Sequence, residues 1–368
     1  MSRLEIFKQL PETLHKSKPS GEMLIGFDGF VDDIIAVIDK RKSVTSYSRI
    51  DTISKYAERV NKLSGVSGSI ELDTLQQKLG GNAPIMGNAL LSQGFVVNCI
   101  ATIGTKGAIH PVFKDFASKC KYMAPIANPG NTLALEFNDG KIMMNQLGSL
   151  GDANWEHIKK TVGEEKLKEL INNCTMAAFV NWAMLPFMST IYSGMSDMLK
   201  SMNKRIKIFI DLADVMRRTS EDIVSMLEIL KQLGQNSDLI LGLNFSEAEQ
   251  ISEQLGIKTQ NSTSEEYSKL ILSKLNITAI VIHETKRAVI ATNKEVIAVD
   301  GPYVEKPKLT TGAGDNFNAG FCSGWNRGLN WEQCLYTGVY TSGFYVRNAH
   351  SPSLDELVLF LKEFSSKN

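Results

Sequence analysis

The chain has little of several features that would place it in a common class of protein. Its five cysteines lie apart from one another, without a C-x-x-C pair, so the sequence predicts neither a zinc site nor a disulfide framework. The net charge is zero, with 40 acidic and 40 basic residues, which gives no support for nucleic acid or an acidic membrane surface as a partner. No apolar run approaches the length of a membrane span. We therefore expect a cytoplasmic protein.

The second half of the chain has a regular pattern of apolar runs. From Asn154 onward, strand-like runs alternate with amphipathic stretches, which is typical of βαβ units in a parallel sheet with helices on both faces. The predicted helices cover residues 155–172, 187–202 and 220–233, and the predicted strands cover 176–181, 206–211 and 239–243. Ligands of such sheets bind beyond the carboxyl ends of the strands. Asn181, Asp211 and Asn244, which end these strands, are therefore expected at the functional edge.

The rest of the chain gives further local signals. Asn138-Asp139-Gly140 lies between two strand-like runs and predicts a hairpin over 131–137 and 141–146. The other predicted helices cover 50–63, 83–93, 331–348 and 353–364, and the other predicted strands cover 23–28, 95–103, 278–282, 288–292 and 295–299.

One stretch, Leu309–Phe321, carries the strongest chemical signal. Gly312 and Gly314 flank a small residue, and Asp315 follows, before apolar residues at helical spacing. This pattern predicts a tight turn that opens a buried helix. The first N–H groups of a helix lack intrahelical partners and attract anions, so the turn suits a phosphate group. A carboxylate beside bound phosphate is unfavourable unless it has a task, such as taking a proton from an attacking hydroxyl.

The same stretch, Thr310–Asp315 followed by Phe317 and Ala319-Gly320, resembles the T-T-G-A-G-D-x-F-x-A-G signature of the ribokinase/PfkB family of carbohydrate and nucleoside kinases. The resemblance implies a ribokinase-like α/β fold, with a doubly wound, mostly parallel sheet, helices on both faces and a small β-sheet lid. The kinase domain would span residues 1–368, with lid segments 33–49 and 131–147 inserted in it. The implied activity is ATP-dependent phosphoryl transfer to a hydroxyl of a sugar. By match, the anion hole falls on Gly312, Ala313 and Gly314, and the catalytic base on Asp315.

Acidic residues follow the first predicted strand and are candidates for binding the sugar. Asp28 ends that strand, and Asp32 follows within the next loop. A carboxylate can accept two hydroxyl hydrogen bonds at once, and the resemblance implies an acidic residue here that holds sugar hydroxyls. Asp28 and Asp32 both fit, and the sequence does not choose between them.

A second substrate candidate is the Gly80-Gly81 pair, which resembles a family turn whose backbone lies under the sugar. Asn82 is expected to be the N-cap of the helix that follows. The family carries an asparagine where this chain has Ile85. Asn82 is the candidate that would replace this polar contact.

The nucleotide side is predicted from Asn244-Phe245-Ser246-Glu247, which resembles the family's N-x-x-E motif. Asn and Glu after a strand can orient phosphates and Mg²⁺-bound water, because Mg²⁺ prefers oxygen ligands. Helix capping alone also explains the pattern. The resemblance implies that Asn244, Glu247 and Thr311 bind nucleotide phosphates, and that Glu247 holds Mg²⁺ through water.

Two departures from the family pattern lie on the nucleotide side. Residues 283–287 contain no glycine, although the family places a glycine-containing nucleotide loop there. Leu309 stands where many members have an aspartate that helps to bind a monovalent cation. Dependence on K⁺ therefore stays open.

Alternative functions remain at this point. The segment Phe209–Asp214 slightly resembles the nucleoside-kinase branch, so the small-molecule partner is a sugar or a nucleoside. The missing glycines would also suit a catalytically silent sugar-binding sensor, although Asp315 argues against it. Lys106, Arg217 and Arg218 are the candidate cations for a phosphate-bearing substrate, and they are weak enough that an uncharged substrate is favoured. A homodimer formed through the lid is a further candidate.

Overall fold

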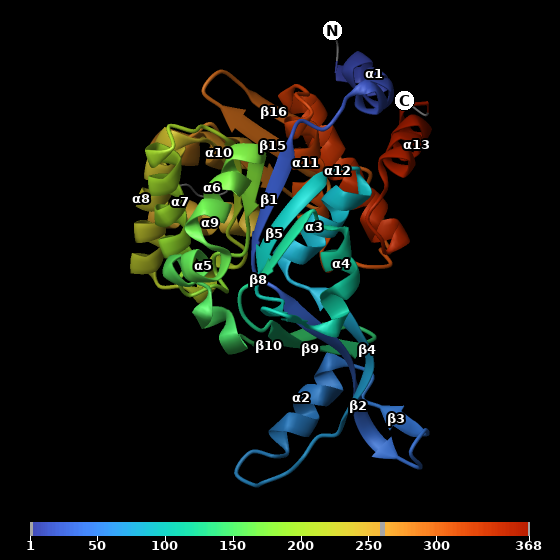
Figure 1. Ribbon diagram of the computed structural model, residues 1–368. Helices are drawn as coiled ribbons and strands as arrows, with labels where there is room; N and C mark the ends of the chain where they lie inside the picture. Colours follow the sequence, from blue (N-terminus) through green and yellow to red (C-terminus); the bar gives the residue numbers. More distant parts are fainter. Residues whose placement is uncertain (1–2, 258–261, 367–368) are drawn as a thin grey trace.

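The computed structural model describes residues 3–257 and 262–366. Its largest element, within these residues, is a nine-stranded sheet in the order β16-β15-β14-β13-β12-β11-β1-β5-β8 (Figure 1). The strands from β8 to β14 are parallel to their neighbours, and β15 and β16 form an antiparallel edge. The bounds are β1 Glu22–Phe27, β5 Val96–Ala101, β8 Tyr122–Pro125, β11 Cys174–Phe179, β12 Lys207–Asp211, β13 Asp238–Asn244, β14 Ala279–His283, β15 Arg287–Thr292 and β16 Val296–Asp300.

Both faces of this sheet are buried, because its strands are apolar on both sides. In β1, Leu24 packs into the core on one face, and Met23 and Ile25 pack into the core on the other. The first core is covered by α5 Trp155–Val162, α6 Glu164–Asn173, α7 Met188–Ser201, α8 Ser220–Asn236, α9 Phe245–Gln254 and α10 Ser264–Leu275. The second core is covered by α1 Arg3–Lys16, α3 Asn82–Ser92, α11 Ala313–Asn326, α12 Trp331–Asn348 and α13 Leu354–Ser365.

A second, smaller sheet projects from one end of the large one (Figure 1). Its strands have the order β10-β9-β2-β3, and β4 pairs with β2. They are β2 Phe30–Arg41, β3 Tyr47–Arg49, β4 Leu72–Gly80, β9 Gly130–Phe137 and β10 Gly140–Gln146. Helix α2 (Ile53–Asn61) lies on it, with the Tyr56 ring 5.5 Å from the Phe137 ring. The segments 33–49 and 131–147 overlap strands of this sheet, whereas the sequence did not predict β4.

Short elements complete the described chain. Strands β6 (Gly104–Thr105) and β7 (Ala108–Ile109) form a two-stranded ladder, and α4 covers Lys114–Lys119. No helix among the described residues is long and apolar enough to cross a membrane. All five cysteines are free thiols, as expected.

The predicted α/β alternation is confirmed, and two local predictions need correction. The predicted helix 155–172 is two helices, because Gly163 has a φ of +90° and interrupts the helical backbone. The N-cap of α3 is Gly81, and Asn82 is the first helical residue. The sequence predicted no element before β1, where α1 forms and buries Leu10 and Leu14 in the second core.

We predict that Gly163→Ala destabilises the fold by about 1–3 kcal/mol, because a side chain strains a backbone with positive φ. An added Cβ at Gly163 would meet no atom within 4 Å, so the effect would come from the backbone alone. The matched control is Gly151→Ala, where nothing lies within 4 Å and φ is not positive. Urea denaturation followed by circular dichroism measures both variants. Equal midpoints for the two variants would contradict the prediction.

Candidate active site

The strand order of the large sheet reverses at β1, which lies between β5 and β11. Ligands of open α/β sheets bind beyond the carboxyl ends of the strands at such a reversal. Asp28 follows β1 there, and Asn181 follows β11. The Asn181 side-chain amide donates to the Asp28 carboxylate at 2.7 Å. The edge of the sheet that the sequence predicted to be functional therefore includes this hydrogen-bonded pair.

Asp28 itself is enclosed by protein. It is fully buried and accepts hydrogen bonds from the backbone N–H groups of Asn82 and Ala83, both at 2.8 Å, in addition to Asn181. It therefore satisfies the N-terminus of α3, the task that the sequence assigned to the Asn82 side chain. Burial raises the pKa of Asp28 to about 6, and its three hydrogen bonds oppose that rise.

Asp32 lies on the other side of the Gly80-Gly81 turn, where it faces a cavity. A Cβ added to Gly80 would lie 2.4 Å from the Asp32 carboxylate, so this position requires glycine. Gly81 has a φ of +92° and packs against Gly29 and Asp28. Burial raises the pKa of Asp32 to about 6. Of the two acids that the sequence left open, Asp32 is the one with access to a ligand.

The cavity beside Asp32 has a volume of about 70 Å³ and lies between the small sheet and the loop before α11. Its polar wall includes Lys78, Lys141 and Tyr345, which the sequence analysis missed. Ile85 and Leu309, two of the departures from the family pattern, form part of its apolar wall. The Tyr345 hydroxyl donates to the Thr311 carbonyl at 2.8 Å and thereby fixes the loop.

Helix α11 begins as the glycine pattern predicts. Gly312 is its N-cap, with a φ of +87°, and an added Cβ there would lie 2.9 Å from the Tyr345 hydroxyl. The Ala313 N–H donates to the Thr310 carbonyl at 3.0 Å. Within the described residues, the N–H groups of Gly312, Gly314 and Asp315 have no acceptor. The free donors for an anion are therefore those of the two glycines and Asp315, and Ala313 is already engaged.

Asp315 lies in the first turn of α11 and is almost fully buried. Its Oδ1 atom has no hydrogen-bond partner in the described part of the chain. Burial raises its pKa well above the ordinary value, the charges of Asp211 and Asp28 raise it further, and the Asn82 side chain opposes the rise. A carboxylate with one free oxygen and a raised pKa is suited to accept a proton from a bound ligand.

A larger cavity, with a volume of about 700 Å³, lies on the other side of the same loop. Thr310 lines this cavity and Thr311 lines the smaller one, so the loop separates two compartments. The wall of the larger cavity includes Asn244, Gly314, Tyr303 and residues 283–287. The Lys286 ammonium lies 4.7 Å from the centre of the Tyr303 ring. Residues 283–287, which contain no glycine, thus line this cavity without filling it.

His283 lies in the wall of the larger cavity, beside the start of α11. Its ring packs against Phe317, with ring centres 4.9 Å apart, and a Cβ added to Gly314 would lie 3.5 Å from it. Burial lowers the pKa of His283 to about 4. The imidazole is therefore neutral at physiological pH and does not supply a positive charge to this compartment.

Asn244 and Glu247 form a complete capping box at the start of α9. The Asn244 side chain accepts from the Glu247 N–H at 2.9 Å, and the Glu247 carboxylate accepts from the Asn244 N–H at 2.8 Å. Burial raises the pKa of Glu247 to about 9, and the charge of Asp211 contributes further. Asp211 is buried too, and accepts from the Asn318 side chain at 2.6 Å.

The acids at this edge fit a divalent cation held through water. A nearby positive charge would favour the ionised form of these two buried carboxyls, and their oxygen atoms suit Mg²⁺. No cluster of three or more metal-ligating side chains exists among residues 3–257 and 262–366.

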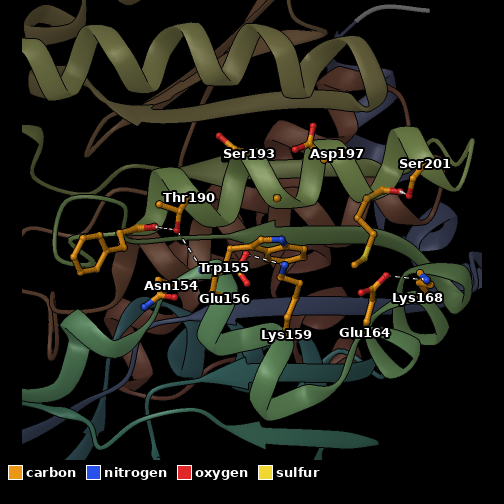
Figure 2. A pocket seen from close by; sticks show the side chains of 13 residues that line it. Asn154, Trp155, Glu156, Lys159, Glu164, Lys168, Thr190, Ser193, Asp197 and Ser201 are labelled. Carbon is orange, nitrogen blue, oxygen red and sulfur yellow. Dashed lines mark hydrogen bonds and ion pairs between the residues drawn. The ribbon is translucent and has the colours of Figure 1, made fainter.

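A third hollow lies elsewhere on the molecule (Figure 2). It has a volume of about 770 Å³, is lined by α5, α6 and α7, and shares no residue with the two cavities beside α11. Its lysines are already paired within it, Lys159 with Glu156 at 2.7 Å and Lys168 with Glu164 at 3.0 Å. Its other polar side chains include Ser193 and Asp197, and the hollow lies apart from the two cavities beside α11.

Comparisons with known proteins agree with this geometry. The model of the prokaryotic ketohexokinase family matches residues 3–364. The chain is 25% identical over 355 residues to a ketohexokinase of Haloferax volcanii, covering 95% of this chain and 93% of that protein.

Solved structures share the fold. A ribokinase of Arabidopsis thaliana complexed with ribose and ATP has a TM-score of 0.65 and 14% identity, covering 93% of this chain and 99% of that chain. An adenosine kinase of Sinorhizobium meliloti has a TM-score of 0.64 and 16% identity, covering 94% and 99%. The ribokinase-like fold that the sequence predicted is confirmed.

We predict that Glu247→Gln stabilises the protein at pH 8 and has little effect at pH 5. In the unfolded chain Glu247 ionises near pH ~4.3, whereas burial raises its pKa in the folded protein to about 9. The folded state therefore holds a proton that the unfolded state has released, so stability falls as the pH rises between these values. Glutamine keeps an acceptor for the Asn244 N–H but cannot ionise.

Urea midpoints at both pH values, without Mg²⁺ or nucleotide, measure this effect. The control is Glu266→Gln, because Glu266 makes the same capping box with Thr263 at the exposed start of α10. If the stability of the two variants responds equally to pH, burial is not the cause of the effect at Glu247.

Proposed function

The chain belongs to the prokaryotic ketohexokinase family and is an ATP-dependent sugar kinase, and we propose that its sugar is a ketohexose. The similarity to a ketohexokinase supports the choice of sugar, and the observation that supports phosphoryl transfer is the meeting of two compartments at the start of α11. One compartment is large and reaches the free N–H of Gly314, and the other is small and contains Asp32. A nucleotide and a sugar on opposite sides of one loop are arranged for in-line transfer.

In the proposed mechanism, Asp315 accepts the proton of the sugar hydroxyl as its oxygen bonds to the γ-phosphorus. The bond between that phosphorus and the oxygen bridging to the β-phosphate breaks, and ADP leaves with that electron pair. The N–H groups of Gly312 and Gly314 stabilise the negative charge on the transferring group. Support comes from the free Oδ1 of Asp315 and from the unpaired N–H groups beside it.

Mg²⁺ is a further part of the proposal, with Glu247 and Asp211 as the residues that would hold it through water. When bound, it would neutralise the phosphate charges. Asn244 borders the larger cavity, and its side-chain N–H₂ group is available to phosphate oxygens. Thr311 was expected to bind phosphate as well, whereas it lines the cavity proposed for the sugar. Its carbonyl accepts the hydrogen bond from the Tyr345 hydroxyl that holds the loop in place. K⁺ dependence stays open.

On the sugar side, we propose Asp32, Gly80, Gly81 and Asn82 as the binding surface, with Asp28 supporting it from behind. The small sheet would act as a lid that excludes water from the transferring phosphoryl group. Asp32, on β2, supports this role because it comes from that sheet and lines the cavity.

The activity is tested by measuring ADP release with Mg²⁺ and ATP across ketohexoses, aldoses and adenosine. We expect a ketohexose to give the highest kcat/KM. A preference for adenosine would identify a nucleoside kinase. Sugar binding without ADP release, and with no thermal shift on adding ATP, would identify a sensor.

We predict that Asp315→Asn lowers kcat by roughly 10²–10⁴-fold while the sugar still binds, because general-base catalysis contributes about that much. Turnover is measured by ADP release, and sugar affinity by calorimetry. A variant that keeps near wild-type turnover would exclude Asp315 as the base.

We further propose that two copies associate through their small sheets. Leu72, Leu75 and Met144 on these strands are exposed apolar side chains, and exposed apolar surface favours a protein contact. Leu75→Glu is expected to shift sedimentation toward the monomer. Val224→Glu on α8 is the control, because Val224 is 44% exposed against 46% for Leu75. A wild-type chain that sediments as a monomer would refute the dimer.

A further inference from the structure

The small sheet presents a row of polar side chains across four of its strands. Lys78 on β4 is the register partner of Asp32 on β2, which is also the partner of Thr132 on β9. Thr132 in turn is opposite Asn145 on β10, and its hydroxyl donates to the Asn145 side chain at 3.1 Å. Directly opposed residues point to the same face of a sheet. The row therefore lies on the face that carries Asp32.

Lys78 differs from the other lysine of the same cavity. Lys141 lines the cavity too, but its ammonium is paired with Glu136 at 2.6 Å. Lys78 is half-buried, and within the described residues it makes no ion pair or hydrogen bond, although its charge acts on Asp32. A partly buried ammonium retains unsatisfied donors, and the cavity is where they can be used.

The geometry points to Lys78 as a specificity-determining residue that contacts the sugar together with Asp32, an inference that rests on the proposed function. Two opposed residues of neighbouring strands have Cβ atoms roughly 5 Å apart, which suits two adjacent hydroxyl groups of one sugar ring. The Lys78 ammonium donates a hydrogen bond to the oxygen of one hydroxyl, and the Asp32 carboxylate accepts a hydrogen bond from the O–H of the next.

The charges around this pair indicate a neutral substrate. Lys78 and Asp32 together carry no net charge, and three further acids, Asp28, Asp211 and Asp315, lie close by. A sugar that carries a phosphate would bring its own negative charge to these acids, with one unpaired ammonium to offset it. Among the cations that the sequence suggested for a phosphate, Arg217 pairs with Asp214 at 3.1 Å, and Arg218 donates to the Leu185 carbonyl at 2.8 Å. Both are engaged outside this cavity.

We predict that Lys78→Met raises KM for the sugar by about 10- to 100-fold, the loss expected for a hydrogen bond to a charged group. KM for ATP and kcat should change by less than about threefold, because Lys78 lies on the sugar side of the loop. Lys141→Met is the matched control and should change KM for the sugar much less. Lys78→Arg should recover part of the affinity.

A series of deoxy sugars separates contact from a structural role. In the wild-type protein, removing the hydroxyl that Lys78 contacts should weaken binding, whereas in Lys78→Met the same removal should have almost no further effect. If every deoxy sugar is penalised equally in both proteins, Lys78 does not contact the sugar. Calorimetric titration gives the comparison without turnover. If the wild-type protein prefers another neutral sugar, the ketohexose proposal fails, and the same series on that sugar decides the role of Lys78.

Discussion

The buried carboxylate of Asp28 joins three segments that lie far apart in the chain. It directly follows β1 and accepts hydrogen bonds from two backbone N–H groups at the start of α3. It also accepts a hydrogen bond from the side-chain amide of Asn181, which follows β11. A buried carboxylate is costly unless its hydrogen bonds are made, so these segments must close around it together. Their closure places the Gly80-Gly81 turn under Asp32 and brings Asn82 beside Asp315. The site thus depends on an acid that does not itself reach the cavity.

Several buried acids lie at the same edge of the sheet, where the proposed function would place a negatively charged polyphosphate. Asp211, Glu247 and Asp315 are buried, and burial raises the pKa of each carboxyl. Neighbouring acids raise the pKa of Glu247 and Asp315 further. The unpaired N–H groups at the start of α11 offer partial positive charge in the same place. Bound cation and substrate would therefore change the protonation of this cluster, which couples ligand binding to pH.

Local signals predicted most of the fold. The apolar strands and amphipathic helices of the second half were found because their patterns repeat within a few residues, and the glycines before α11 identify its start. Strand β4 was missed because its residues are largely exposed and show no apolar alternation. The break at Gly163 and the helix α1 were missed because one glycine and a mixed-charge segment are weak signals.

The sequence by itself determined the α/β class, the glycine turn before α11 and the place of Asp315 in its first turn, because each depends on residues that are neighbours in the chain. Only the tertiary structure decided that Asp28 is buried while Asp32 faces a cavity, and that Asp28 caps α3 in place of the Asn82 side chain. It also brought Lys78 and Tyr345 to the cavity beside Asp32. These outcomes depend on strand register and on packing between distant segments, and no local pattern of residues encodes either of them.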